Sequence, residues 1–278
     1  MLKIILVMNA ADINTRSIDF AAYIAGLTQS KLTGLFIQRA VHEQAASLKT
    51  PFGLPYVETI TAGDEERLYN SQAVSRNIAL FEQACIKRDV CYTTELLKGK
   101  ELDIITKESR FADLIILSSD TSFETGANEG VPTRFTRNLL NQSQCPVIVS
   151  PESFDEIDEI IFACDGSKSA IHAIKQFTYL FPQLNAIKIT LLHVIPTGEE
   201  RTKDEGVMAW LRLHYAEVLE EKLTGEPSDE LFGALLLKRN KFIVMGSFGR
   251  TLFSLALKPS TAALLLKTVN LPIFIAHT

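Results

Sequence analysis

The stretch Ile4-Ile5-Leu6-Val7-Met8-Asn9 returns 156 residues further along the chain (160 − 4) as Ile160-Ile161-Phe162-Ala163-Cys164-Asp165. Both stretches are short apolar runs that end on a polar or small residue, which is typical of a strand buried on both faces of a parallel sheet. A second pair of segments matches near the end of each half, Cys145-Pro146-Val147-Ile148-Val149 and Leu271-Pro272-Ile273-Phe274-Ile275. A repeat this long predicts two duplicated domains and not a solenoid of short repeats.

Within each half, short apolar runs alternate with segments of helical periodicity. Residues 15–27 carry apolar side chains at helical spacing, and Asp64 is placed to cap a long helix that runs to about Arg88. The alternation predicts an α/β fold of two tandem, doubly wound, parallel five-stranded sheets. The predicted strands are 3–8, 32–37, 91–97, 113–118 and 146–150 in the first half, and 159–164, 187–194, about 217–223, 241–246 and 272–276 in the second.

The boundary between the halves is predicted at the short acidic linker 151–157, which begins with a proline. The predicted domains are therefore 1–151 and 157–278. The first half carries a surplus, because Gly99 follows Ile37 by 62 residues (99 − 37) whereas the equivalent Gly225 follows His193 by only 32 (225 − 193). Much of this surplus is the segment 41–63, whose prolines and glycines predict a long loop, either a lid or a dispensable surface excursion.

Composition limits the classes of protein to which the chain can belong. Its 278 residues are 46% hydrophobic and 22% charged, which excludes a disordered or fibrous chain. The net charge of −5 gives no electrostatic basis for binding nucleic acid or an anionic membrane. No apolar stretch approaches the roughly 18 residues of a membrane span, and no signal peptide is visible. Because the four cysteines form no CxxC pair and two lie in apolar runs, we expect free thiols in a cytoplasmic protein.

Open α/β sheets bind ligands at the carboxyl ends of their strands, so the residues that follow each strand are the candidates for a site. In the second half, one strand is followed by Asp165-Gly166-Ser167 and another ends in Gly246-Ser-Phe-Gly249-Arg250. The two glycines let backbone N–H groups approach a phosphate. Ser260 and Thr261, at a predicted helix start, add donors where the helix dipole favours an anion. Asp165 is placed to accept hydrogen bonds from an adenine amino group or a ribose, so the set predicts a nucleotide site.

Each of these features also has a purely structural explanation. Glycines often simply terminate strands, an Asp-Gly-Ser segment is equally a helix N-cap, and Arg250 alone is an ordinary solvated cation. His193 lies in an apolar strand, which favours a hydrogen-bonded core histidine over a ligand. The sequence contains no histidine spacing for a metal, no P-loop and no nucleophile elbow, so we predict neither a metal site nor catalytic residues.

The second half resembles the universal stress protein family over nearly its whole length, and the whole chain is similar to a tandem member with two such domains. The segments that carry the resemblance are Ile160–Ser167, Leu191–Val194, Val244–Arg250 and Leu271–Ile275. In the nucleotide-binding branch of that family, a third glycine follows the second glycine of the loop after nine residues. Here that position is Pro259, which has no N–H to give to a phosphate oxygen.

The resemblance implies where an adenine nucleotide, such as ATP with Mg, would bind in the second domain. Asp165 and Val194 would face the adenine and the ribose, with Gly166 beside them. The residues implied around the phosphates are Gly246, Gly249, Arg250, Ser260 and Thr261.

The first half departs further from the family pattern. Asn9-Ala10 stands where the second half has Asp165-Gly166. Gly126 and Gly130 do not reproduce the glycine spacing, and acidic residues of their loop would face the position of the phosphates. We interpret this half as a degenerate partner that binds no nucleotide.

In this family single domains pair through their last strands. The resemblance therefore implies that Val147–Ser150 pairs antiparallel with Ile273–Ala276, which makes an internal pseudo-dimer and covers two exposed sheet edges. A homodimer of the whole chain is a further expectation.

The function that the resemblance implies is that of a stress-response regulator that binds an adenine nucleotide and is not an enzyme. The alternative is an interaction scaffold of the same fold that binds no nucleotide and contacts a protein through residues 38–63 or the sheet surfaces. An ATP-hydrolysing enzyme is a third hypothesis, opposed by the missing P-loop lysine, the missing base and Pro259.

Overall fold

A computed structural model describes residues 1–39, 46–49, 56–59, 64–124, 129–195, 197, 205–236, 238–246 and 269–276. All ten predicted strands are confirmed. In the first half they are β1 (Lys3–Asn9), β2 (Lys31–Arg39), β5 (Tyr92–Gly99), β6 (Leu114–Ser118) and β7 (Val147–Ser150). In the second half they are β8 (Glu159–Ala163), β9 (Lys188–Ile195), β10 (Val218–Thr224), β11 (Lys241–Gly246) and β12 (Ile273–Ala276).

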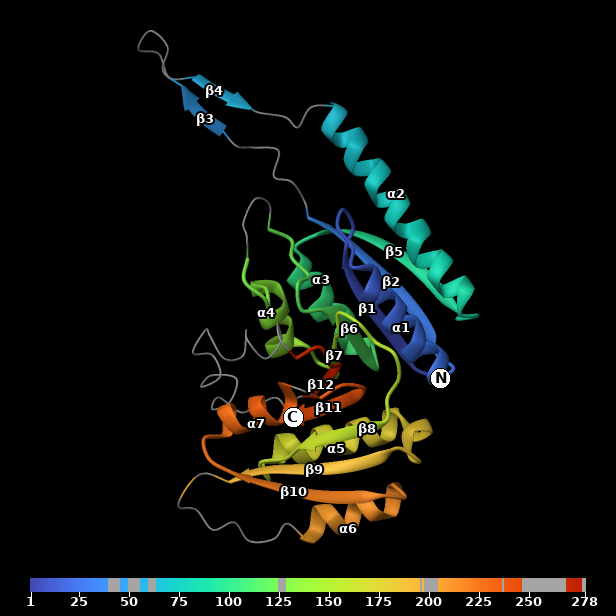
Figure 1. Cartoon of the computed structure of the whole chain (residues 1–278). Coiled ribbons are helices and arrows are strands. Elements are labelled where there is room, and N and C mark those ends of the chain that lie inside the picture. The colour runs from blue at the N-terminus through green and yellow to red at the C-terminus, as the bar shows by residue number, and fades with distance from the viewer. Residues whose placement is uncertain are drawn as a thin grey trace.

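The two halves build one ten-stranded sheet in the order β10-β9-β8-β11-β12-β7-β6-β1-β2-β5 (Figure 1). Within each half the pairing is parallel, and the spatial order of the five strands is the same. The equivalent glycines at the ends of the matched edge strands, Gly99 and Gly225, have φ of 151° and 157°. The predicted duplication therefore extends to the topology and to the local backbone.

Helices cover both faces of the sheet, as a doubly wound fold requires. One face packs against α1 (Thr15–Leu27), α2 (Asp64–Lys87), α5 (Lys168–Leu180) and α6 (Glu205–His214). The other packs against α3 (Glu101–Glu108), α4 (Arg134–Gln142) and α7 (Pro227–Leu236). Helix α2 begins at Asp64 itself, so this residue is the first of the helix and not its cap. Among the described helices, none has the length and apolar character needed to cross a membrane.

The predicted antiparallel pairing of the last strands is confirmed. Strand β12 pairs antiparallel with β7, with Ile273 opposite Val149, Phe274 opposite Ile148 and Ile275 opposite Val147. All of the β7 and β12 side chains are buried, because each strand lies in the middle of the sheet.

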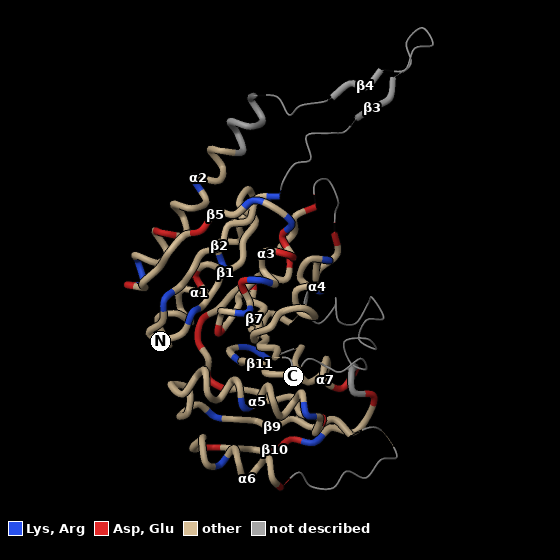
Figure 2. Tube along the Cα trace, turned by 180° about the vertical axis from the view of Figure 1, so that it is seen from behind, with Lys and Arg blue, Asp and Glu red and all other residues tan. Residues whose placement is uncertain are grey.

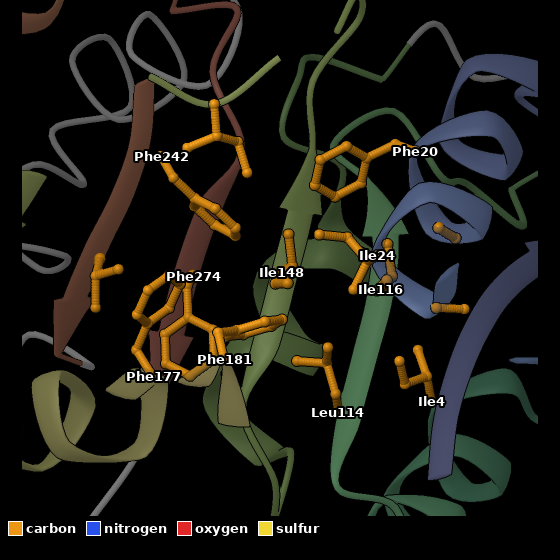
Figure 3. Close-up of a cluster of buried hydrophobic side chains, with 14 of the residues drawn as sticks. Ile4, Phe20, Ile24, Leu114, Ile116, Ile148, Phe177, Phe181, Phe242 and Phe274 are labelled. Atoms are coloured by element: carbon orange, nitrogen blue, oxygen red, sulfur yellow. The ribbon is translucent and has the colours of Figure 1, made fainter. Parts of the chain in front are cut away.

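The hydrophobic core on one face runs without a break across this junction (Figure 3). Phe20 of α1 lies 6.5 Å from Phe242 of β11, measured between ring centroids, so aromatic side chains of the two halves are in contact. Phe154 of the linker packs edge-on against Phe20, at 5.1 Å between ring centroids, and lies 4.6 Å from Tyr23. The linker is therefore held against the first half by its own aromatic side chain.

Charged residues occupy matching positions at the amino ends of the first and fourth strands of each half, but with the signs exchanged. In the first half Lys3 lies beside Asp113, whose carboxylate accepts a hydrogen bond from the Lys3 backbone N–H at 2.7 Å. In the second half Glu159 lies beside Lys241, with 3.1 Å between carboxylate oxygen and Nζ.

Glu159 is the buried member of this second pair. It also accepts a hydrogen bond from the Thr190 hydroxyl and lies 3.6 Å from Lys188 Nζ, while its side chain is only 8% exposed. Burial raises the pKa of Glu159, but the hydrogen bonds from Thr190 and Lys241 and the charges of Lys241 and Lys188 outweigh burial and hold the pKa below its ordinary value of 4.5.

The segment 41–63 is not the plain loop that was predicted. It contains β3 (Ala46–Lys49) and β4 (Tyr56–Thr59), which pair antiparallel with each other. The prolines and glycines between them indicated a turn, and the short β-prone runs on either side were overlooked. Figure 1 places β3 and β4 beyond the amino-terminal end of α2, far from the second half, which does not support a lid over the candidate site there.

We expect Ile148→Ala to lower the free energy of unfolding by about 2–5 kcal/mol, because it removes a fully buried side chain from the core that crosses the junction. Ile86→Ala is the matched control, since Ile86 is 66% exposed and its loss should cost less than about 0.5 kcal/mol. Urea unfolding followed by circular dichroism measures both. Equal losses in the two variants would contradict a junction held by packing.

We expect Glu159→Gln to be less stable than the wild type at pH 7 by about 1–3 kcal/mol, because Lys241 loses one carboxylate and keeps only Asp158. The pKa of Glu159 is lower in the folded protein than in the unfolded chain. Its contribution to the free energy of unfolding is therefore complete when the pH is above the pKa of the unfolded chain, and it is lost as the pH falls through the pKa of the folded protein. The wild type should therefore lose stability more steeply than the variant as the pH falls below 4.5. Glu152→Gln, at an exposed position, should keep the wild-type pH profile.

Candidate functional site

Four of the predicted site residues come together at the carboxyl ends of three neighbouring strands. Ala163 lies opposite both Leu192 of β9 and Met245 of β11, so the residues that follow these positions share one edge of the sheet. That edge carries Asp165, Gly166, Val194 and Gly246. The other predicted residues, Gly249, Arg250, Ser260 and Thr261, and also Pro259, lie outside the described residues.

The turn after β8 is organised by the side chains of Asp165 and Ser167. Asp165 Oδ1 accepts a hydrogen bond from the Ser167 backbone N–H at 2.9 Å, and Gly166 between them has φ of 72°, in the region that favours glycine. Ser167 is the N-cap of α5, because its hydroxyl oxygen accepts a hydrogen bond from the Ala170 N–H at 3.1 Å. The helix-cap interpretation of this segment is therefore confirmed. The Asp165 side chain is nevertheless exposed at the sheet edge, where a ligand can reach its carboxylate.

Packing against α5 requires a glycine at position 246, and the sequence alone does not reveal this requirement. A Cβ atom at this position would lie 2.5 Å from the Ser169 carbonyl carbon and 2.6 Å from the Ala170 nitrogen. Only glycine lets the end of β11 approach the first turn of α5 this closely. The close approach brings the start of the glycine loop next to the amino-terminal end of α5, and it explains Gly246 without any phosphate.

His193 is a core histidine, as predicted. Its side chain is buried, Nδ1 lies 2.9 Å from the Cys164 carbonyl oxygen, and Nε2 lies 3.7 Å from a Glu220 carboxylate oxygen. The contact with Cys164 fixes the peptide directly before Asp165, so His193 helps to position the turn. The sequence predicted His193 as a core residue but not its role in positioning the turn. The one feature that pointed to this role was its place next to Val194 in the segment Leu191–Val194, which resembles the family.

The first half has a polar pocket of about 270 Å³ at the equivalent place, the carboxyl ends of β1 and β6. The side chains of its two asparagines form hydrogen bonds within the protein. Asn9 Nδ2 donates to the Ser122 carbonyl at 2.8 Å, and Asn14 Nδ2 lies 3.2 Å from both the Ser118 hydroxyl and an Asp120 carboxylate oxygen. Asn14 Oδ1 also caps α1 by accepting from the Arg16 N–H. The amide groups of this pocket are thus engaged inside the protein.

The acidic residues of the first-half loop do not all face this pocket. Asp120 lines it, whereas Glu124 pairs with Arg39 at 2.9 Å and Glu129 accepts a hydrogen bond from the Ser122 hydroxyl at 2.7 Å. The hydrogen bond with Glu124 raises the pKa of Arg39. Of these acidic residues, Asp120 is the one that lines the pocket, whereas Glu124 is turned to Arg39.

Comparisons with known proteins find similarity in structure and none in sequence. No protein-family model matches the chain, and no curated protein matches it in sequence. A universal stress protein from Archaeoglobus fulgidus DSM 4304 superposes with a TM-score of 0.65 at 16% identity, covering 99% of this chain and 96% of that one. A putative universal stress protein from Pseudomonas aeruginosa UCBPP-PA14 gives 0.55 at 18% identity, covering 99% and 93%.

A third structure, a functionally unknown protein from Pseudomonas aeruginosa PAO1, gives a TM-score of 0.55 at 19% identity, covering 99% of this chain and 92% of that one. Because each of these three structures is matched over nearly its whole length, the likeness includes both halves and their connection. The fold that the resemblance implied is therefore confirmed: the chain has the fold of the universal stress proteins, with two units in tandem.

Proposed function

We propose that the chain is a tandem universal stress protein, a stress-response regulator whose second half binds an adenine nucleotide. The observation that supports this most is the gathering of Asp165, Gly166, Val194 and Gly246 at one sheet edge, at the carboxyl ends of β8, β9 and β11. Asp165 offers an exposed carboxylate there, and Gly246, the first residue of the glycine motif, lies beside the start of α5.

In this proposal Asp165 and Val194 hold the adenine and ribose, with Gly166 allowing the turn between strand and helix. Gly249, Arg250, Ser260 and Thr261 are proposed around the phosphates. Pro259 gives one N–H fewer than a glycine would, so the phosphate contacts depend more on Arg250 and on the hydroxyl groups. Mg, when bound with ATP, would neutralise phosphate charge.

We propose that the nucleotide is held and sensed, and is not turned over. The Asp165 carboxylate is already committed through Oδ1 to the Ser167 N–H, which favours a role in recognition over proton transfer. The first half is proposed to act as a structural partner in an internal pseudo-dimer, and the whole chain to form a homodimer. Free thiols, with burial raising the pKa of Cys85 to about 12 and of Cys145 to about 11, fit the cytoplasm that we propose as its compartment.

The proposal predicts that Mg-ATP binds at a single site and raises the free energy of unfolding by about 2.7 kcal/mol at a hundredfold excess over Kd. Asp165→Asn should weaken binding about tenfold or more. Asparagine keeps the oxygen that accepts from Ser167 but replaces the outward acceptor with an N–H₂ donor, which cannot accept from an adenine amino group or a ribose hydroxyl. Titration calorimetry and thermal unfolding measure both effects.

Asp12→Asn is the matched control, because Asp12 lines the equivalent first-half pocket and is exposed. It should leave binding unchanged, and a loss there instead would move the nucleotide to the first half. Absence of heat and of stabilisation would favour the scaffold that binds no nucleotide. Phosphate release above background in the same samples would contradict a purely sensing role.

A further inference from the structure

A second pocket, of about 460 Å³, lies at the other end of the second half's strands. Lys241, the first residue of β11, and Pro272, just before β12, both line it. The linker forms another wall through residues 153–156. It is therefore separate from the edge that carries Asp165, and it lies where the linker joins the two halves.

Opposite charges face this pocket from different segments. The linker contributes Asp155 and Glu156, and the segment before β11 contributes Lys238 and Arg239. Figure 2 shows the acidic linker beside the basic segment that enters β11. Within the described residues, no ion pair joins either of these acidic side chains to either of these basic ones, so the charges on both walls are left to face a ligand. Lys241 differs, because it is already held by Asp158 at 2.6 Å and by Glu159 at 3.1 Å.

The pocket also has an apolar part. Phe154, Leu236 and Leu271 line it, and Leu236 is 40% exposed. Phe154 is fixed by its contacts with Phe20 and Tyr23, so the wall to which it belongs is anchored to the first half. A ligand in this pocket would contact apolar side chains between two charged walls of opposite sign.

We propose that this pocket binds a short zwitterionic peptide with free ends and apolar side chains. A simple anion would face Asp155 and Glu156 without compensation, and a simple cation would face Lys238 and Arg239. A peptide places its carboxylate on Arg239, whose guanidinium forms paired hydrogen bonds with carboxylates, and its ammonium on the linker acids. The volume lies within the range of about 300–1,000 Å³ for small-molecule sites and exceeds what one small ion fills.

Binding in this pocket would tie the linker to the segment before β11. Because Phe154 packs on α1, the peptide would join a wall anchored in the first half to a wall of the second half. The ligand should therefore raise the unfolding temperature of the full chain. This inference does not depend on the proposed nucleotide site, since no residue is shared between the two.

The test is titration calorimetry of the full chain with the dipeptide Leu-Leu, compared with N-acetyl-Leu-Leu, which has no ammonium, and with Leu-Leu-amide, which has no carboxylate. We expect Leu-Leu to bind and each capped form to bind about tenfold more weakly. Arg239→Gln and Asp155→Asn should each weaken Leu-Leu binding by a similar factor. Arg212→Gln, at an exposed position on α6, carries the same change of charge and should leave binding unchanged.

Failure of Leu-Leu to bind at millimolar concentration overturns the proposal. Equal binding of Leu-Leu and its two capped forms also overturns it, because the pocket would then recognise apolar groups and not the charged ends. The capped peptides test the wild-type protein, so the proposal stays falsifiable if a variant folds poorly. Lys238→Gln, which weakens the same basic wall, is the second variant for that case.

Discussion

The antiparallel contact between β7 and β12 is the constraint on which the rest of the molecule depends. It joins two sheets of five strands through only three residue pairs, yet it places both strands at the centre of a continuous sheet. Because the halves meet antiparallel, every strand of the first half runs opposite to those of the second. Helices α1, α2, α5 and α6 nevertheless share one face, so one aromatic core serves both halves.

The same contact decides where the pockets lie. The carboxyl ends of the first-half strands point to the edge of the sheet that holds the amino ends of the second-half strands. The nucleotide site proposed at Asp165 and the polar pocket at Asn9 therefore open at opposite edges, although they occupy equivalent places in the repeat. The linker runs along the edge shared with Asn9, which puts the charged pocket at the junction and away from Asp165.

The sequence allowed the fold to be predicted in detail because buried parallel strands are apolar throughout, and such runs are easy to recognise between amphipathic helices. Strands β3 and β4 were missed because they are short, side by side in sequence and separated by prolines and glycines. At the candidate site, the placement of Asp165 followed from the rule for strand ends, and that of Val194 from the family resemblance. The packing that requires glycine at position 246 could not be predicted, because it is a contact with Ser169 and Ala170, which are far away in sequence. The charged pocket was not predictable, since three separate segments line it.

The exchanged charges at the amino ends of the strands have a consequence for folding. During folding, strands of two duplicated halves can pair with the wrong half, because the apolar runs that pair in one half also fit the other. A sheet that placed β6 beside β8 would set Asp113 against Glu159, and one that placed β11 beside β1 would set Lys241 against Lys3. Each wrong pairing would bring like charges together, whereas the native pairing puts Lys3 beside Asp113 and Glu159 beside Lys241. The exchanged signs therefore disfavour pairing between strands of different halves at these two positions.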